Sequence, residues 1–264
     1  MSEIVLVTGA NGQLGKEFQA LSSKYPDFEF HFFDHSILDI CNKNAIENAF
    51  QSLKPQYLIN CAAYTAVDKV EAEKEKAFLV NAEAVENLAE VCKAYQTRMI
   101  HFSTDYVFDG TKNTPFNEDD QTNPVNVYGQ SKREGELKLE QYSAVSIIRT
   151  SWLYSSFENN FVKSMLRLAE NRSELRVVAD QIGAPTYACD LAQMVLSNLT
   201  RLGELGTAIY HYSNEGVLTW YDFAHAIFDI TGKEIKLYPV TTEEYPTAAK
   251  RPHYTVLDKG KIKS

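Results

Sequence analysis

Short apolar runs and amphipathic segments alternate along the first part of the chain. Continuous apolar or β-branched runs are typical of strands buried on both faces of a parallel sheet. We expect such strands at 4–7, 28–33, 57–60, 99–102 and 145–149. Apolar residues spaced three or four positions apart indicate helices, which we expect at 14–22, 43–53, 73–95 and 127–142. The alternation predicts an α/β fold, a doubly wound parallel sheet with right-handed crossovers.

The alternation becomes less regular after about residue 150. There the pattern predicts helices at 158–171, 189–202 and 220–231, with short strands near 175–178, 208–213 and 235–238. We interpret residues 1–150 as a sheet domain and residues 151–264 as a smaller C-terminal α/β lobe that interleaves with the sheet edge. Because no Gly/Ser-rich linker separates the two parts, we expect them to share an extended interface.

Composition and charge narrow the class of partner. The chain has 264 residues, 44% hydrophobic and 23% charged, which is typical of a folded protein. Its formal net charge of −9 argues against a general binder of nucleic acid or of anionic membranes, because both need a basic surface. No apolar run approaches the ~18 residues of a membrane helix, and the N-terminus lacks signal-peptide features. We therefore expect a cytoplasmic protein with no nucleic-acid or membrane partner.

The cysteines and histidines do not form a metal-binding pattern. The four cysteines are scattered without a C-x-x-C pair, and the six histidines form no cluster with ligand spacing. We expect buried free thiols in a reducing compartment, and no metal site. The cysteines are Cys41, Cys61, Cys92 and Cys189.

A glycine-rich turn follows the first expected strand. Residues 8–15 read Thr-Gly-Ala-Asn-Gly-Gln-Leu-Gly and open the first expected helix. Gly9 permits the tight turn, Gly12 lets the backbone approach a pyrophosphate, and Gly15 lets the helix pack closely on the strand. The helix N-terminus presents unpaired N–H groups and a positive dipole end to the anion. This context favours a dinucleotide site over a plain structural turn.

Acidic residues after the second strand suit the adenosine end of a dinucleotide. Asp34 lies 19 residues beyond Gly15 and could accept hydrogen bonds from the ribose hydroxyls. A carboxylate there repels a 2′-phosphate, which favours NADH. Asp39 and Ile40 fit the next loop, where a carboxylate can bind the adenine amino group. The alternatives are a solvated turn residue for Asp34 and a helix-cap residue for Asp39.

Tyr128 and Lys132 form a Y-x-x-x-K pair on one face of an expected helix. A nearby ammonium stabilises a phenolate, so we expect Lys132 to lower the pKa of Tyr128. Ligands of such sheets bind at the carboxyl ends of the strands. The fourth strand ends there in Ser103 and Thr104, either of which could supply a hydroxyl to a substrate carbonyl. Because a Tyr–Lys pair at this spacing is common by chance, the interpretation depends on the surrounding residues, Ser103 and Thr104.

Together these segments resemble the extended short-chain dehydrogenase/reductase superfamily and, within it, the dTDP-4-dehydrorhamnose reductase family. The match runs from residue 1 to about residue 260. It is most particular at 65–71, 103–110 and 180–186. The segments that carry it are 8–15, 60–71, 103–110, 126–132, 149–152, 159–161, 180–186 and 251–252.

The resemblance implies a Rossmann-like domain that binds the dinucleotide at residues 1–150 and a substrate-binding lobe at 151–264. It further implies reduction of the C4 ketone of dTDP-4-dehydro-L-rhamnose to dTDP-L-rhamnose, a step in nucleotide-sugar and cell-surface polysaccharide biosynthesis. The reductant would be NADPH or NADH, and the protein would be a monomer or a homodimer.

The resemblance also assigns roles to matching residues. Tyr128 would donate the proton, and Thr104 would assist at the carbonyl. Lys132 would lower the pKa of Tyr128 and hold the nicotinamide ribose. The implied substrate contacts are Thr104, Asp105, Trp152 and Arg251. The implied cofactor contacts are Gly9, Asn11, Gly12, Gln13, Leu14, Gly15, Asp34, Asp39, Ile40, Ala62, Ala63, Thr65, Ser103, Tyr128 and Lys132.

Two of these residues could have a purely structural role. The sequence also departs from the family pattern in two places. Trp152 could be a core residue, and Arg251, which could meet the substrate diphosphate, could be a surface arginine. The chain stops at Ser264, where family members usually continue into a C-terminal helix. Some relatives bind magnesium through glutamates at a dimer interface; Glu17 matches one such position, but 189–190 does not supply another.

Two other functions compete with the reductase. A sugar-nucleotide epimerase or dehydratase is the first, although a dehydratase needs more carboxylates beside Thr104 than Asp105 alone. The second is a non-catalytic, dinucleotide-binding regulatory subunit of the methionine adenosyltransferase type. The intact set of Thr104, Tyr128 and Lys132 argues against it.

Overall fold

Six parallel strands form the central sheet of the computed structural model, which describes residues 2–202 and 207–264. Their order across the sheet is β10-β5-β4-β3-β1-β2, and every neighbouring pair is parallel. The predicted doubly wound α/β fold is therefore confirmed. The strands are β1 (Glu3–Thr8), β2 (Phe28–Phe33), β3 (Tyr57–Asn60), β4 (Arg98–Thr104), β5 (Val145–Thr150) and β10 (Ala208–Tyr212).

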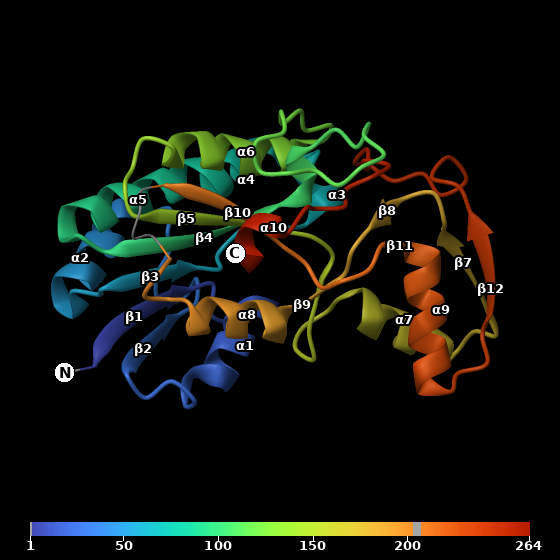
Figure 1. Cartoon of the computed structure of the whole chain (residues 1–264), viewed down its shortest axis with the longest axis horizontal. Helices are drawn as coiled ribbons and strands as arrows, with labels where there is room; N and C mark the ends of the chain where they lie inside the picture. The colour runs from blue at the N-terminus through green and yellow to red at the C-terminus, as the bar shows by residue number, and fades with distance from the viewer. Residues whose placement is uncertain (1, 203–206) are drawn as a thin grey trace.

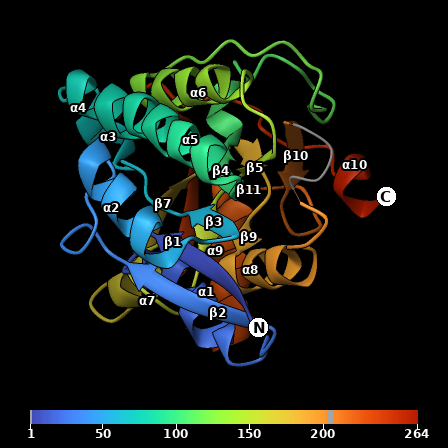
Figure 2. The same cartoon turned by 90° about the vertical axis from the view of Figure 1, so that its left-hand side faces the viewer.

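Helices cover both faces of this sheet (Figures 1 and 2). The helices α1 (Gln13–Ser22) and α8 (Ala188–Ser197) lie on one face, and α2 (Lys43–Leu53), α5 (Ala84–Tyr95) and α6 (Val127–Leu139) lie on the other. Successive side chains of a strand point to opposite faces, so Val5 and Val7 join the core under α1 while Leu6 joins the core under α2 and α5. This explains why the strands read as continuous apolar runs.

A smaller lobe lies beside the sheet, at the right of Figure 1. The helices α7 (Phe161–Ala169) and α9 (Trp220–Thr231) pack there on the parallel pair of β7 (Glu174–Val178) and β12 (Lys236–Val240). Helix α9 starts at a capping box between Thr219 and Asp222 and ends at Gly232 in the left-handed conformation. The other strands of the smaller lobe are β6 (Leu153–Tyr154), β8 (Ile182–Gly183), β9 (Thr186–Tyr187) and β11 (Leu218–Thr219). Helix α10 (Gly260–Lys263) follows near the C-terminus.

Two elements that we expected in the smaller lobe belong to the sheet domain instead. Strand β10 pairs with β5 along its whole length and forms the sheet edge. Helix α8 buries Leu191 and Val195 against the same core as α1. The reason is that β5 would otherwise be an open edge with unpaired backbone groups. The chain thus crosses back over the expected boundary at residue 150.

The helix predicted over 73–95 is interrupted. After α3 (Val67–Val70), the structure has α4 (Lys74–Phe78), then a π-helical turn over Leu79–Glu83 (η1), and then α5. The Asn81 side chain in this turn is buried. It accepts from Tyr64 N (2.8 Å) and donates to Tyr64 O (3.0 Å) and Ser131 Oγ (3.0 Å). Asn81 therefore links the loop after β3 to helix α6.

The cysteines differ from expectation in burial. All four are free thiols, but only Cys92 is buried, and the other three are half-buried. Within 2–202 and 207–264, no helix combines the length and the apolar character that a bilayer crossing requires.

Candidate active site

The glycine turn and the loop after β3 meet at the point where the sheet reverses its order. From β1 the chain runs to β2 on one side, and β3 returns to the other side of β1. Gly9 has φ +65°, and a Cβ there would lie 2.5 Å from Ala62 N and 2.6 Å from Cys61 C. Only glycine allows this approach. Ligands of doubly wound sheets bind in the crevice at such a switch point.

Gly12 faces open space at this crevice. It begins α1 without a side-chain cap, and a Cβ there would meet only Gly9 O, at 3.4 Å. Protein packing therefore does not require glycine at this position, while Gly12 lines two adjoining cavities of about 550 and 410 Å³. Gly15 differs, because its Cβ would lie 2.4 Å from Gly9 O. An uncapped helix start beside an open backbone fits a pyrophosphate.

The smaller cavity contains the acidic residues expected at the adenosine end, Asp34 and Asp39. Asp34 also holds its own turn: it accepts from Ser36 Oγ (2.6 Å), Ser36 N (2.9 Å) and Asn11 Nδ2 (2.5 Å). These bonds, that of the Ser36 hydroxyl foremost, lower the pKa of Asp34. Asp39 accepts from Cys41 N (2.9 Å). Asp34 and Asp39 therefore each stabilise a turn of their own loop and also line the cavity.

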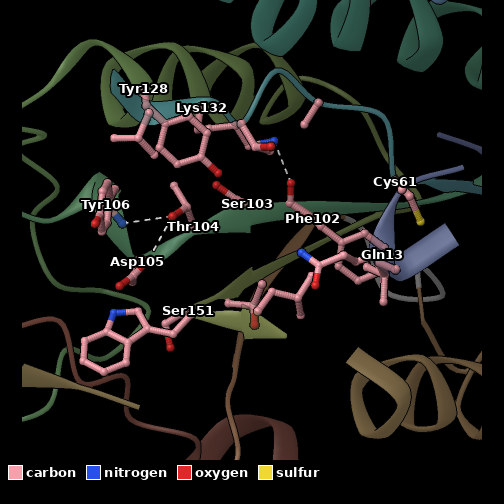
Figure 3. Close-up of a pocket in the computed structure, with 18 of the residues that line it drawn as sticks. Gln13, Cys61, Phe102, Ser103, Thr104, Asp105, Tyr106, Tyr128, Lys132 and Ser151 are labelled. Atoms are coloured by element: carbon pink, nitrogen blue, oxygen red, sulfur yellow. Dashed lines mark hydrogen bonds between the residues drawn. The ribbon is translucent and has the colours of Figure 1, made fainter. Parts of the chain in front are cut away.

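Tyr128 and Lys132 project from α6 over the end of β4 (Figure 3). The Tyr128 ring extends toward Thr104 and Ser103. Burial raises the pKa of Tyr128, against a smaller opposing effect of the Thr104 hydroxyl. The Thr104 hydroxyl donates to Asp105 Oδ1 (2.9 Å) and accepts from Tyr106 N (3.2 Å). The phenol is therefore protonated at neutral pH and directed at the cavity.

The structure contradicts the predicted effect of Lys132 on Tyr128. Lys132 Nζ donates to Phe102 O (2.7 Å) and lies 3.2 Å from His101 Nε2. The groups that set the pKa of Tyr128 are its own burial, Thr104 and Asp105, so the pKa rises instead of falling. Burial also lowers the pKa of Lys132, to about 8. The physical reason is that loss of water outweighs any effect of a cation directed elsewhere.

Two buried polar atoms in the large cavity lack a partner among the described residues. They are Ser103 Oγ and Asp105 Oδ2. Burial raises the pKa of Asp105 to about 6, although the hydroxyls of Thr255 and Thr104 favour its charged form. Unpartnered buried polar atoms are costly.

Trp152 lines the same cavity and stacks on Trp220, with ring centroids 3.6 Å apart and planes at 12°. Its backbone has φ +45°, and the indole lies so close to Gly183 that a Cβ there would be 2.7 Å from it. Trp152 is thus both packed against protein and exposed to the cavity. Together the two indoles form an aromatic wall on which a sugar ring can stack.

Arg251 lies between the large cavity and a third cavity of about 670 Å³ in the smaller lobe. It is not a free surface arginine, because its guanidinium binds both oxygens of Asp68, at 2.9 and 2.7 Å. This contact lowers the pKa of Asp68. The third cavity is lined by Asp68, Phe161, Ser164, Met165, Leu168, Arg176, Val177, Val178, Gln181, Trp220, Tyr245, Pro246, Thr247, Ala248 and Arg251.

All the predicted site residues except Gly15 line one of the two crevice cavities. The large one includes Gly12, Gln13, Leu14, Ala62, Ala63, Thr65, Ser103, Thr104, Asp105, Tyr128, Lys132, Trp152 and Arg251. The small one includes Gly9, Asn11, Gly12, Asp34, Asp39, Ile40, Ala62 and Ala63.

Sequence reasoning missed Asn60, His101, Asp68 and Trp220. Asn60 and His101 are polar residues inside otherwise apolar strands, which is the signal that could have found them. Glu17 is buried and accepts from Ser155 Oγ (2.6 Å). In the described part of the chain, no group of three or more His, Cys, Asp or Glu side chains could hold a metal ion.

Comparison with known proteins agrees with this site. A family model described as the RmlD substrate binding domain matches residues 2–264. The chain belongs to the RmlD family. A dTDP-4-dehydrorhamnose reductase from Aggregatibacter actinomycetemcomitans is 46% identical, over 98% of this chain and 91% of its own length. The spore coat polysaccharide biosynthesis protein SpsK of Bacillus subtilis (strain 168) is 42% identical, over 96% of this chain and 88% of its own.

A solved structure of the RmlD type extends the comparison to the fold. The dTDP-4-dehydrorhamnose reductase from Bacillus anthracis str. Ames, in complex with NADP, superimposes on this chain with a TM-score of 0.95. It is 40% identical in sequence, and the match covers 100% of this chain and 92% of that one. The resemblance found in the sequence segments is thereby confirmed.

Proposed function

We propose that this RmlD-family protein is an NAD(P)H-dependent reductase. It converts the C4 ketone of dTDP-4-dehydro-L-rhamnose into the alcohol of dTDP-L-rhamnose, for nucleotide-sugar and cell-surface polysaccharide biosynthesis. The observation that carries the proposal is a protonated, half-buried phenol, Tyr128, directed at Thr104 in a cavity continuous with the glycine turn. Relatives named as dTDP-4-dehydrorhamnose reductases and a neighbour solved with NADP support it.

The crevice residues fit the dinucleotide. Gly12 and the uncapped start of α1 would hold its pyrophosphate, Asp34 and Asp39 its adenosine end, and Lys132 its nicotinamide ribose. When bound, the reduced nicotinamide supplies a hydride for the carbonyl carbon. Tyr128 gives its proton to the carbonyl oxygen, so C=O becomes CH–OH. The high pKa of Tyr128 keeps that proton in place until negative charge develops on the oxygen.

The substrate occupies the remainder of the large cavity and continues into the third. Its sugar stacks on Trp152, beside Ser103 and Asp105 of the same cavity. Arg251, at the boundary of the two cavities, faces the diphosphate, and the nucleoside lies in the third cavity. This places the C4 ketone, the reacting group, at the end of the cavity that Tyr128 and Thr104 line.

The test is to mix the protein, NADPH or NADH, and the dTDP-4-keto sugar, and to follow the absorbance of the reduced nicotinamide. Sugar-dependent consumption supports the reductase. In Tyr128→Phe, turnover falls by about 10²-fold or more, while dinucleotide affinity changes little. Tyr142→Phe, beyond the same helix and outside the cavities, is the matched control. Near-normal turnover in Tyr128→Phe would remove Tyr128 from its role.

Tight dinucleotide binding without sugar-dependent consumption would favour a non-catalytic binding subunit instead. We further propose that the protein works in the cytoplasm, as a monomer or a homodimer. Four free thiols support the reducing compartment. Light scattering of the purified protein distinguishes the two assembly states.

A further inference from the structure

A line of buried polar side chains leads from the glycine turn to Lys132. Thr8, Asn60 and His101 lie side by side on β1, β3 and β4, since Thr8 pairs in register with Asn60 and Asn60 with His101. Thr8 and His101 have no exposed surface, and Asn60 and Lys132 are each 1% exposed. Hydrogen bonds along this line must therefore be internally consistent.

The donors and acceptors of Asn60 are fixed by its neighbours. Ala62 N lies 3.1 Å from Asn60 Oδ1, and a backbone N–H can only donate, so the oxygen faces it. Thr8 Oγ1 donates to the same oxygen at 2.7 Å. The amide nitrogen Nδ2 therefore faces His101 Nδ1, at 3.0 Å, and donates to it.

This fixes the proton on His101. Because Nδ1 accepts from Asn60, a neutral imidazole must carry its single proton on Nε2. That Nε2–H points at Lys132 Nζ, 3.2 Å away. An ammonium group has three donors and no lone pair, so it cannot accept this hydrogen bond. A neutral amine can, and it keeps an N–H for the 2.7 Å bond to Phe102 O.

We propose that His101 is a positioning residue: its Nε2–H is directed at Lys132 Nζ and favours the neutral amine of Lys132 over the ammonium. Resting on the proposed function, this bond orients the Lys132 amine, whose second N–H stays available to donate to an acceptor oxygen of the nicotinamide ribose. The geometry links the glycine turn, through Asn60, to the charge of the residue beside Tyr128.

The charges around Lys132 agree with this assignment. Glu136, on the same helix, favours the charged form, but its oxygens are bound by Arg149 of β5. Tyr128, on the same helix, is a protonated phenol, and His101 of β4 stays neutral because burial lowers its pKa. Burial in turn brings the pKa of Lys132 to about 8. Asn60 of β3 and Asn81 of the π-helical turn add no charge.

The first experiment reads the tautomer directly. Long-range ¹H–¹⁵N spectra of the intact protein, labelled in histidine, distinguish Nε2–H from Nδ1–H, and the His101→Gln variant identifies the resonance. We expect neutral Nε2–H for His101 from about pH 6 to about pH 9. An Nδ1–H tautomer or an imidazolium would overturn the proposal. This measurement needs no turnover, so it is independent of the proposed reaction.

His211 is the internal control in the same spectrum. Its Nδ1 lies 3.1 Å from Phe116 O, which can only accept, and its Nε2 lies 3.4 Å from Arg149 Nη1, which can only donate. We therefore expect the opposite tautomer, Nδ1–H, at His211. If both buried histidines show the same tautomer, the argument from donors and acceptors fails.

The second experiment follows Lys132 in lysine-labelled protein, with Lys132→Met for assignment. We expect the pKa of Lys132 to be about 8 or lower, and a proton retained to the ordinary lysine pKa of about 10.4 contradicts the proposal.

Asn60→Asp keeps the acceptor oxygen for Ala62 and Thr8 but replaces the donor that faces His101. We expect His101 to switch to Nδ1–H, and Lys132 to hold its proton to a pH higher by about one unit or more. If Asn60→Asp does not fold, the spectrum of the native protein still decides. If it folds and His101 keeps Nε2–H, Asn60 does not set the tautomer.

Discussion

Lys132 and Arg149 are both 1% exposed, yet their surroundings are opposite. Arg149 binds Glu136 through Nε (2.9 Å) and Nη2 (2.7 Å), and it lies over the Phe108 ring at 5.1 Å. Among the described residues, the hydrogen-bond partners of Lys132 Nζ are the neutral His101 and the carbonyl of Phe102. A buried cation with a carboxylate is neutralised within the fold. One without a carboxylate has a labile proton, and that is the one in the cavity.

The ion pair of Arg149 with Glu136 also positions Lys132. Glu136 lies on α6 one turn after Lys132, so its bond to Arg149 fixes α6 against β5. Arg149 also contacts His211, which binds Phe116 of the 109–124 loop. The structural ion pair thus holds the helix that carries the proposed chemistry.

The largest expected effect comes from breaking the structural pair. In Arg149→Met, the buried Glu136 loses both hydrogen bonds to Arg149 and keeps the longer contact with Arg133 (3.4 Å), and the free energy of unfolding falls by about 3–5 kcal/mol. Urea titration measures this. The exposed arginine of the Arg176–Glu244 pair is the control, and Arg176→Met should cost less than about 1 kcal/mol. Equal losses in the two variants would refute the distinction.

A second substitution sharpens that result. Arg149→Met combined with Glu136→Leu removes both charges, and most of the lost stability should return, because an apolar pair needs no ionic partner. A double variant no more stable than Arg149→Met would mean that packing, and not the unpaired charge, caused the loss.

Lys132→Met should lose activity but keep its stability, the opposite of Arg149→Met. Turnover of the dTDP-4-keto sugar falls by about 10³-fold, while the free energy of unfolding does not decrease by more than about 1 kcal/mol, because no carboxylate is left unpaired. Lys138→Met, on the surface of the same helix and paired with Glu86, is the control and should keep its turnover. A Lys132→Met protein that unfolds as readily as Arg149→Met would place Lys132 among the structural cations.

The pH dependence of stability tests the unpaired state of Lys132. Its pKa is 10.5 for the unfolded chain and about 8 in the fold. Between these values the unfolded chain binds more protons, so this group makes the free energy of unfolding rise with pH; below pH 8 its cost, about 3 kcal/mol, is present in full. The stability advantage of Lys132→Met over the native protein should therefore shrink by about 2–3 kcal/mol from about pH 7 to about pH 10. A constant difference would show that the pKa of Lys132 is not lowered.

An exposed charge should have the smallest effect. Asp34→Asn removes a carboxylate from the adenosine cavity, and the ratio of NADPH to NADH affinity should rise by about fivefold, because repulsion of the 2′-phosphate is lost. The rise should diminish at high salt. Asp119→Asn, at an exposed position of the 109–124 loop, should leave the ratio unchanged. A lower ratio in Asp34→Asn would mean that Asp34 does not face the 2′ position.

The parallel sheet and most of the site could be predicted from sequence, because they depend on local patterns. Apolar runs gave the strands, and the glycine turn gave the switch point. Every predicted contact except Gly15 lines a cavity. By contrast, β10 and α8 were assigned to the wrong lobe, because their position depends on pairing with a distant strand and helix and not on their own periodicity.

The pKa of Tyr128 shows the other limit. The i,i+4 spacing correctly places Tyr128 and Lys132 on one face, but spacing does not show where an ammonium is aimed. The direction of Nζ is decided by His101 and Phe102, which lie on strand β4, away from helix α6 in the sequence. Likewise, Trp220 could not be joined to Trp152 without the fold of the smaller lobe.

The π-helical turn over Leu79–Glu83 makes this helix intolerant of changes in its length. Deleting one residue would restore regular α-helical winding and rotate Asn81 by about 100° around the axis, away from Tyr64 and Ser131. Helix α6 passes so close here that a Cβ on Gly135 would lie 2.2 Å from Asn81 O. An uninterrupted helix in this segment would therefore displace the loop after β3, whose Ala62 and Ala63 line both crevice cavities.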